Sequence, residues 1–138
     1  MIIADTGFWL ALANRRDKHH KLANSALARV KEPLVTTWPV LTETCHLLVT
    51  RMSIDAELAF IESARDGAFE IFDLSPAQWP RMRELMEQYR ELPMDLADAS
   101  LVLLAEHLES GKILSTDTRD FGIYRWKNRR PFRNLLSM

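Results

Sequence analysis

Short apolar runs that end in an acidic residue are the feature that most constrains this chain. Asp5 closes the run at residues 2–4, and Asp117 closes the run at residues 113–116. In an open α/β sheet, ligands bind outside the carboxyl ends of the strands. Acidic residues gathered there repel one another unless a cation neutralises them. The pattern therefore predicts a site for a hard divalent cation such as Mg²⁺ or Mn²⁺, which prefers oxygen ligands.

Further carboxylates stand where helices are expected to pack beside this rim. Glu43 follows a short Pro-containing stretch after the apolar run that begins at residue 34. Asp98 is surrounded by small residues that allow close packing, so we expect it to be partly buried and to need a partner. Asp95 lies three residues earlier, on the same helix face. Asp120 follows Asp117 by three residues.

Each carboxylate taken alone also has an ordinary explanation. Asp5 and Asp117 could simply cap backbone amides in a turn, as aspartate after a strand often does. Glu43 could be a solvated helix position, and Asp95 could be an N-cap. Taken together, the carboxylates indicate a metal site more strongly than any one of them does alone.

The order of predicted elements indicates an α/β fold. Strands are expected near residues 2–5, 34–36, 69–74 and 112–116, and helices near 8–13, 17–30, 39–52, 53–67, 75–90 and 95–109. Asp17 is expected to cap the second helix, and Gly111 to stop the last one. Strands that alternate with helices imply a parallel sheet covered on both faces, with the strand carboxyl ends on one rim.

Size and composition limit the classes of protein to consider. The 138 residues predict a single domain over 1–138, and the hydrophobic content of 47% suffices for a core. A net charge of −1 creates no global field toward a polyanion, so RNA would have to meet a local patch. The single cysteine, Cys45, excludes an internal disulfide and fits a cytoplasmic protein. No apolar run approaches the length of a membrane span, so no membrane partner is expected.

A basic stripe with interleaved aromatic residues occupies positions 119–133. Its cations are Arg119, Arg125, Lys127, Arg129, Arg130 and Arg133, and its aromatics are Phe121, Tyr124, Trp126 and Phe132. Such a stripe suits single-stranded RNA. The aromatics could equally pack the last sheet edge, and the cations could dock an acidic partner. These three interpretations remain open at the level of sequence.

Histidine offers weaker metal candidates. Glu43 and His46 have the spacing of di-iron bundles, but that design needs the motif twice and it occurs once here. His19 and His20 follow Asp17 at an expected helix start, where capping and exposure are the simpler explanation. The chain shows no zinc-type spacing and no glycine-rich phosphate loop.

Four segments, at residues 2–9, 42–48, 96–102 and 113–121, resemble PIN domains, and in particular VapC-type toxins of prokaryotic toxin–antitoxin pairs. The resemblance spans nearly the whole chain in the right order. It implies a three-layer α/β/α fold with a central, mostly parallel sheet. It also implies a Mg²⁺- or Mn²⁺-dependent endoribonuclease that is neutralised by a small antitoxin. By position, Asp5, Glu43, Asp98 and Asp117 match the acidic quartet of the family, while Asp95 and Asp120 match positions that are often acidic.

The chemistry fits these residues, because metal ions can polarise a phosphate and generate a nucleophile from water. We expect Asp5 and Asp98 to be direct ligands and Asp117 to complete the site directly or through water. Glu43 is expected to bind a second metal or to orient the attacking water. One alternative is a catalytically silent RNA- or protein-binding module. Another is a Mg²⁺-dependent phosphotransfer domain, which usually needs a second acid two residues after the strand-end Asp.

A homodimer is also expected. The segment 38–67 carries more apolar residues than one buried face requires, and exposed apolar patches commonly mark interfaces. These residues are Leu47, Leu48, Val49, Met52, Leu58, Phe60 and Ile61.

Overall fold

A five-stranded parallel sheet forms the centre of the computed structural model, which describes residues 1–137. The strands are β1 (Ile2–Ala4), β2 (Leu34–Thr37), β3 (Glu70–Phe72), β4 (Lys112–Leu114) and β7 (Arg133–Asn134). Their spatial order is β3-β2-β1-β4-β7, and every neighbouring pair is parallel. The predicted α/β fold with a parallel sheet is confirmed.

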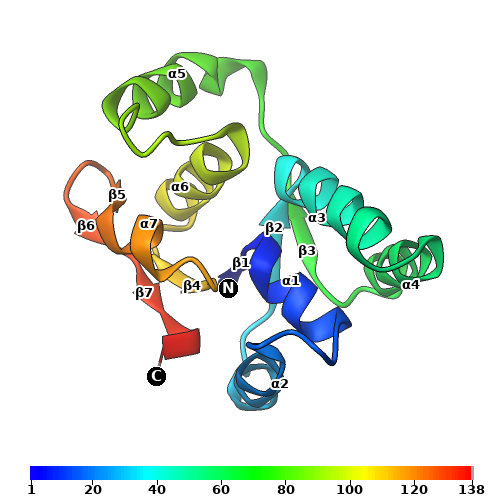
Figure 1. Ribbon diagram of the computed structural model, residues 1–138. Coiled ribbons are helices and arrows are strands. Elements are labelled where there is room, and N and C mark those ends of the chain that lie inside the picture. Colours follow the sequence, from blue (N-terminus) through cyan, green and yellow to red (C-terminus); the bar gives the residue numbers. More distant parts are fainter. Residues whose placement is uncertain (138) are drawn as a thin grey trace.

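Helices flank this sheet, with α5 and α6 on one side and α2 on the other in Figure 1. The α-helices are α1 (Thr6–Ala13), α2 (His20–Arg29), α3 (Trp38–Arg51), α4 (Ile54–Arg65), α5 (Trp79–Gln88), α6 (Leu96–Leu108) and α7 (Thr118–Ile123). Two 3₁₀ turns, η1 (Pro76–Gln78) and η2 (Leu135–Ser137), precede α5 and follow β7. No helix within residues 1–137 is long and apolar enough to cross a membrane.

Local capping explains most of the helix starts. The Ser53 side chain accepts the amide of Ala56 and so begins α4. Ser75 and Gln78 form a reciprocal capping box at η1, which delays the regular helix α5 to Trp79.

Two predicted helix ends are wrong. Asp17 does not cap α2; its side chain accepts the amide of His19 in the preceding turn, and the helix begins at His20. Gly111 does not stop α6; the helix ends at Leu108 because Glu109 adopts a left-handed conformation with φ of 54°.

The role of Gly111 is to admit an aromatic ring. A Cβ atom at this position would lie 2.4 Å from Nε1 of Trp126 and 3.0 Å from the carbonyl of Pro131. Trp126 belongs to a two-stranded antiparallel hairpin, β5 (Arg125–Trp126) and β6 (Arg130–Pro131). The hairpin therefore packs at the end of α6 that precedes β4.

Candidate functional site

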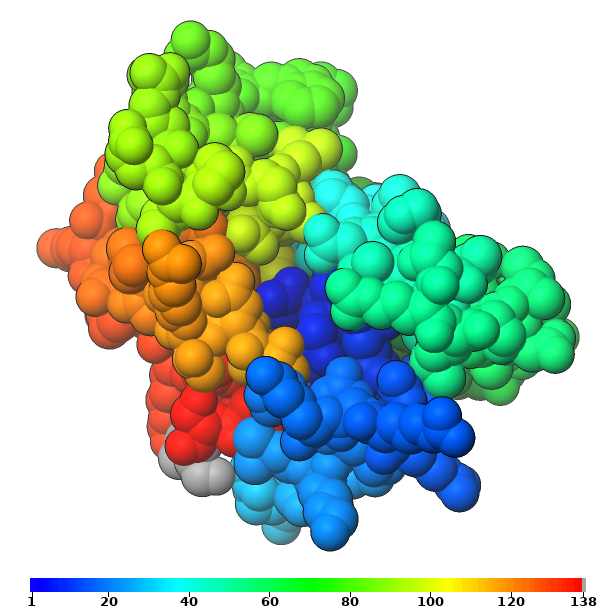
Figure 2. All heavy atoms as spheres, in the orientation of Figure 1, coloured from blue at the N-terminus to red at the C-terminus, as the bar shows by residue number. Residues whose placement is uncertain are grey.

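The six predicted carboxylates line one cavity at the carboxyl rim of the sheet. β1 pairs with β4 in parallel, with Ala4 opposite Leu114, so the residues that follow these strands meet. The cavity has a volume of about 320 Å³ and its lining includes Asp5, Glu43, Asp95, Asp98, Asp117 and Asp120. In Figure 2, the dark blue start of the chain forms the floor of a hollow between the segments of α3, α6 and α7. Segments far apart in sequence thus build one acidic site.

Asp5 is the most enclosed of these carboxylates, with 7% of its surface exposed. One carboxylate oxygen accepts the Thr6 amide at 2.7 Å, and the other accepts the Ser115 hydroxyl at 2.9 Å. Burial nevertheless raises the pKa of Asp5 to about 6, and the charges of Glu43 and Asp117 add to the rise.

Asp98 is held from the opposite side of the cavity. Its Oδ2 atom accepts the Tyr124 hydroxyl at 2.8 Å. Burial raises the pKa of Asp98 to about 8, with further contributions from Asp95 and Asp5. The same burial and the facing carboxylate raise the pKa of the Tyr124 hydroxyl, which therefore stays a hydrogen-bond donor.

Three of the carboxylates also cap helices. Asp5 is the N-cap of α1, Asp95 accepts the Asp98 amide at the start of α6, and Asp117 accepts the Asp120 amide at the start of α7. The capping interpretation is therefore confirmed for Asp5, Asp95 and Asp117, and these residues line the acidic cavity as well. Positive helix ends partly offset the negative charge of the cavity.

Glu43 reaches the cavity from α3, half-buried, one helical turn before Leu47, which lines it as well. Asp120 lies beside Asp117, and burial together with that neighbouring carboxylate raises its pKa. Gly7 lets the β1 and β4 ends approach closely, since a Cβ at Gly7 would lie 1.9 Å from Oγ1 of Thr116.

The residues of the cavity suit a hard cation chemically, although they do not form a closed coordination shell. All the ionisable groups are carboxylates, the ligand type that Mg²⁺ and Mn²⁺ prefer. The buried Thr6 Oγ1 atom has no hydrogen-bond partner within residues 1–137. In the same range, no three His, Cys, Asp or Glu side chains are arranged so that they could hold a metal ion by themselves. A metal here would keep water or substrate oxygens in its shell, as Mg²⁺ commonly does.

Sequence reasoning missed the polar residues that support the carboxylates. In the sequence, Ser115 stands in an apolar run and Tyr124 in the basic stripe. The Ser-Thr-Asp sequence at 115–117 gave a signal for Ser115, because such hydroxyls often bond nearby amides; its Oγ accepts the Asp117 amide at 3.0 Å. No local signal pointed from Tyr124 to Asp98, which lies 26 residues away.

The basic stripe divides into a packed part and an exposed part. Phe121, Tyr124 and Trp126 are buried in the core, which confirms the packing interpretation for these aromatics. Arg125 donates to the carbonyls that end α7, and Lys127 pairs with Glu109 at 2.6 Å. An RNA or antitoxin role for the remaining arginines stays a prediction.

The histidine candidates lie outside the acidic cavity. His46 is exposed on α3 and is absent from the cavity lining. His20 places Nδ1 2.7 Å from the Ala11 carbonyl, and His19 lies against Asp17. These contacts support the ordinary structural interpretation of the histidines and not a metal site.

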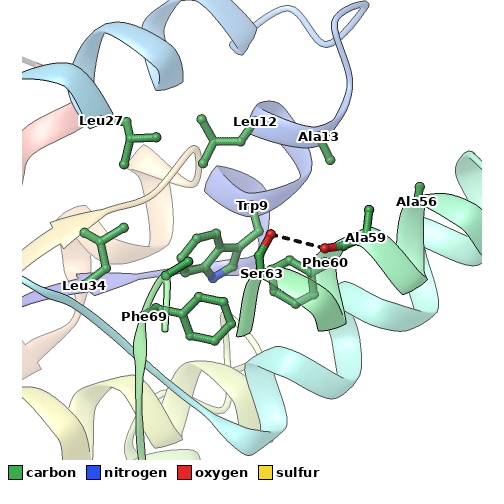
Figure 3. A pocket seen from close by; sticks show the side chains of 11 residues that line it. Trp9, Leu12, Ala13, Leu27, Leu34, Ala56, Ala59, Phe60, Ser63 and Phe69 are labelled. Carbon is green, nitrogen blue, oxygen red and sulfur yellow. Dashed lines mark hydrogen bonds between the residues drawn. The ribbon is translucent and has the colours of Figure 1, made fainter. Parts of the chain in front are cut away.

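A second cavity of about 360 Å³ lies between α1, α2 and α4 and is largely apolar (Figure 3). Trp9, Phe60 and Phe69 form its aromatic wall. The Ser63 hydroxyl donates to the Ala59 carbonyl at 3.1 Å, as the dashed line in Figure 3 shows. No ionisable side chain lines this cavity, so it offers no acid, base or metal ligand for a reaction.

Comparison with known proteins agrees with the fold. The family model for the PIN domain matches residues 2–127. The chain is 28% identical over 124 residues to Ribonuclease VapC26 of Mycobacterium tuberculosis, covering 90% of this chain and 92% of that protein. It is also similar to the crystal structure of VapC20 of Mycobacterium tuberculosis, a toxin that cleaves the sarcin-ricin loop. That likeness has a TM-score of 0.80 and 22% identity over 86% of this chain and 92% of that chain, and it supports the fold.

Proposed function

Because the chain belongs to the PIN-domain family, we propose that it is a metal-dependent endoribonuclease of the VapC type and the toxin of a toxin–antitoxin pair. One observation carries this proposal: six carboxylates from four separate parts of the chain line one cavity at the carboxyl rim of the sheet. Like charges gathered at this density suit a site that receives a cation.

The proposed metal is Mg²⁺ or Mn²⁺, because the cavity offers oxygen ligands only. Asp5, Asp98 and Asp117 would hold the ion, with Glu43 and Asp95 at the margin of the site. When bound, such an ion polarises a phosphate and lowers the pKa of a bound water.

The residues of the chain would orient and tune the site. Ser115 and the Thr6 amide fix both oxygens of Asp5, and the Tyr124 hydroxyl fixes Asp98. Partners of this kind determine where a ligand oxygen points and how basic it is. Glu43 is half-buried and has no hydrogen bond that commits it elsewhere within residues 1–137. This freedom supports a role in which Glu43 would orient the attacking water or accept its proton.

The two rival functions fit the site less well. A silent binding module gains nothing from buried carboxylates whose pKa values are raised, because such a cluster costs stability. A phosphotransfer domain would need a second acid two residues after Asp5. Gly7 occupies that position, and any side chain there would collide with Thr116.

We further propose RNA as the substrate, a small antitoxin protein as the partner, and the cytoplasm as the location where both are met. A homodimer is proposed as the form of the free protein. The relation to Ribonuclease VapC26 supports RNA as the substrate, and the resemblance to VapC-type toxins supports an antitoxin partner. The exposed apolar residues on α3 and α4 support the homodimer.

Growth arrest tests the toxin role. Wild-type protein expressed alone is expected to stop growth, and Asp5→Asn is expected not to, because it loses an anionic ligand while keeping the size and shape of the side chain. Soluble expression of both proteins is the control. If folded Asp5→Asn arrests growth as strongly as wild type, metal-dependent cleavage is not the source of toxicity.

A further inference from the structure

A groove between α5 and the start of α6 carries an exposed tryptophan. It has a volume of about 310 Å³ and is lined by Trp79, Met82, Arg83, Met86, Glu87, Arg90 and Leu96. The α5 residues follow helical spacing and so form one face of the helix. Leu96, in the first turn of α6, forms the other wall, and the residue before it is Asp95 of the acidic cavity. The groove and the cavity thus each take residues from the start of α6.

The groove presents groups that single-stranded nucleic acid recognises. The Trp79 side chain is 60% exposed, and its ring contacts no other aromatic ring within residues 1–137. Arg83 has no ion pair in the same range. Arg90 forms a surface ion pair with Glu87 at 2.7 Å. A free indole face stacks on a base, and a free guanidinium beside it attracts phosphate.

The helix that carries Trp79, α5, is fixed against α6. Arg81 reaches from the opposite face of α5 to Glu106 of α6, with contacts of 3.1 and 2.7 Å. Met82 and Leu85 are buried beneath the helix. The exposed indole is therefore held on a fixed support, which limits the entropy lost when a ligand binds.

A polyanionic substrate would gain from an anchor near the cavity. The carboxylates repel RNA wherever a metal does not intervene, and the net charge of the chain gives no general attraction. The basic hairpin contacts α6 near its C-terminal end through Glu106 and Glu109, although its first residue, Arg125, directly follows Tyr124, which donates to Asp98. The α5 groove takes its other wall from Leu96, which directly follows Asp95 of the acidic site in the sequence.

We propose that the α5 groove binds the single-stranded segment of the RNA substrate next to the cleavage site, with one base stacked on Trp79 and a phosphate on Arg83. This proposal rests on the proposed ribonuclease function and names how the substrate is held. A second copy of the chain or another protein is the competing occupant.

Binding to a short mixed-sequence RNA oligonucleotide, measured by fluorescence anisotropy in the Asp5→Asn background, tests the groove without cleavage. Trp79→Ala is expected to weaken single-strand binding about 5- to 150-fold, as loss of one stacked base does, and Trp79→Phe is expected to recover most of it. The same RNA as a duplex is expected to bind weakly in every variant, because its bases cannot stack on the indole.

The salt dependence separates stacking from phosphate contact. Arg83→Ala is expected to lower the slope of log K against log salt by about 0.7, whereas Trp79→Ala leaves the slope unchanged. Trp38→Ala is the matched tryptophan control, since Trp38 is 56% exposed but lies outside the groove. Arg65→Ala is the arginine control, since Arg65 is exposed on α4, outside both the groove and the basic stripe. Both controls are expected to bind like the Asp5→Asn parent. Thermal melting checks that each variant is folded.

The outcomes distinguish the two proposals. If wild type cleaves RNA while Trp79→Ala and Arg83→Ala bind it unchanged, the groove proposal is overturned and the ribonuclease proposal stands. Loss of self-association in light scattering, with normal RNA binding, would assign the groove to a protein partner instead. If wild type neither cleaves RNA with Mn²⁺ nor binds the single strand, the ribonuclease proposal itself fails.

Discussion

Asp98 carries a proton in the folded chain at pH values where most aspartates have lost theirs. Its pKa rises from the usual 3.8 to about 8, chiefly because of burial, and the pKa of Asp5 rises to about 6. At pH values between about 4 and about 8, the folded chain therefore binds more protons than the unfolded chain does. The stability of the metal-free protein must therefore fall as pH rises from about 4 to about 8.

Asp98→Asn should remove much of this dependence. The asparagine needs no proton to be neutral, so the metal-free variant is expected to melt roughly 3–5 °C above wild type at pH 8, which is ~1 kcal/mol for a domain of this size. At acid pH the two should melt together. Thermal melts across the pH range, in chelator, measure the difference. An equal pH dependence in both proteins would show that Asp98 is not the group that titrates.

The stabilisation that a bound metal gives should increase, not decrease, as the pH rises. Because a metal must displace the protons on Asp5 and Asp98, Mg²⁺ or Mn²⁺ is expected to raise the melting temperature of wild type more at pH 8 than at pH 6. Asp98→Asn should show a weakened shift. A shift of the same size in Asp98→Asn would remove Asp98 from the metal site.

Tyr124 is expected to position Asp98 without touching the substrate. Tyr124→Phe keeps the buried ring but removes the hydroxyl that donates to Asp98. Loss of such a supporting partner typically costs about 10- to 100-fold in metal affinity or activity. The metal dependence of RNA cleavage should therefore shift to higher Mn²⁺ concentration. Wild-type metal affinity in a folded Tyr124→Phe would contradict the positioning role.

At the scale of elements, the site depends on how closely two strand ends approach. Gly7 at the start of α1 faces Thr116 after β4, and a methyl group there would overlap Oγ1 of Thr116. Gly7→Ala is expected to destabilise the protein by about 1–3 kcal/mol, as overpacking does. Adding Thr116→Ala removes the clashing oxygen and leaves Cβ at 3.1 Å, so the double variant should recover most of the loss. If the double variant melts as low as Gly7→Ala, the contact is not the cause.

The sequence was sufficient for the parts of the fold that depend on local pattern. Strand-ending carboxylates such as Asp5 and Asp117, and helix starts such as Ser75-Pro76, are encoded within a few residues. The support of Asp98 by Tyr124 was not predictable, because it depends on the path of α7 after β4. The burial of Leu48 and Phe60 was likewise set by tertiary packing of α3 and α4 rather than by their apolar content.

At the scale of the whole molecule, the surface of α3 and α4 indicates self-association. Leu48 and Phe60 are in the core, so the exposed apolar surface of this region is smaller than predicted. Val49, Met52, Ile54, Leu58 and Ile61 remain exposed there. Exposed apolar residues grouped on two adjacent helices are typical of a symmetric dimer interface.

Leu58→Lys should weaken that dimer. A charge placed in an apolar interface loses its hydration without a partner, so the variant is expected to be monomeric by light scattering at tens of micromolar, roughly the range of a modest interface. Leu22→Lys, on α2, is the control and should leave the assembly unchanged. A wild-type protein that is already monomeric under these conditions would refute the homodimer.

RNA cleavage by the purified protein is the most direct test of the acidic site as a metal-dependent ribonuclease centre. Wild type and Asp5→Asn are incubated with total RNA and Mn²⁺, with and without chelator, and the new RNA ends are mapped. We expect wild type to produce discrete ends only with the metal, and Asp5→Asn to cut at less than about a hundredth of that rate, since loss of a ligand should exceed the 10- to 100-fold cost of losing a supporting partner. Equal cleavage by folded Asp5→Asn, or cleavage by wild type in chelator, would contradict the assignment.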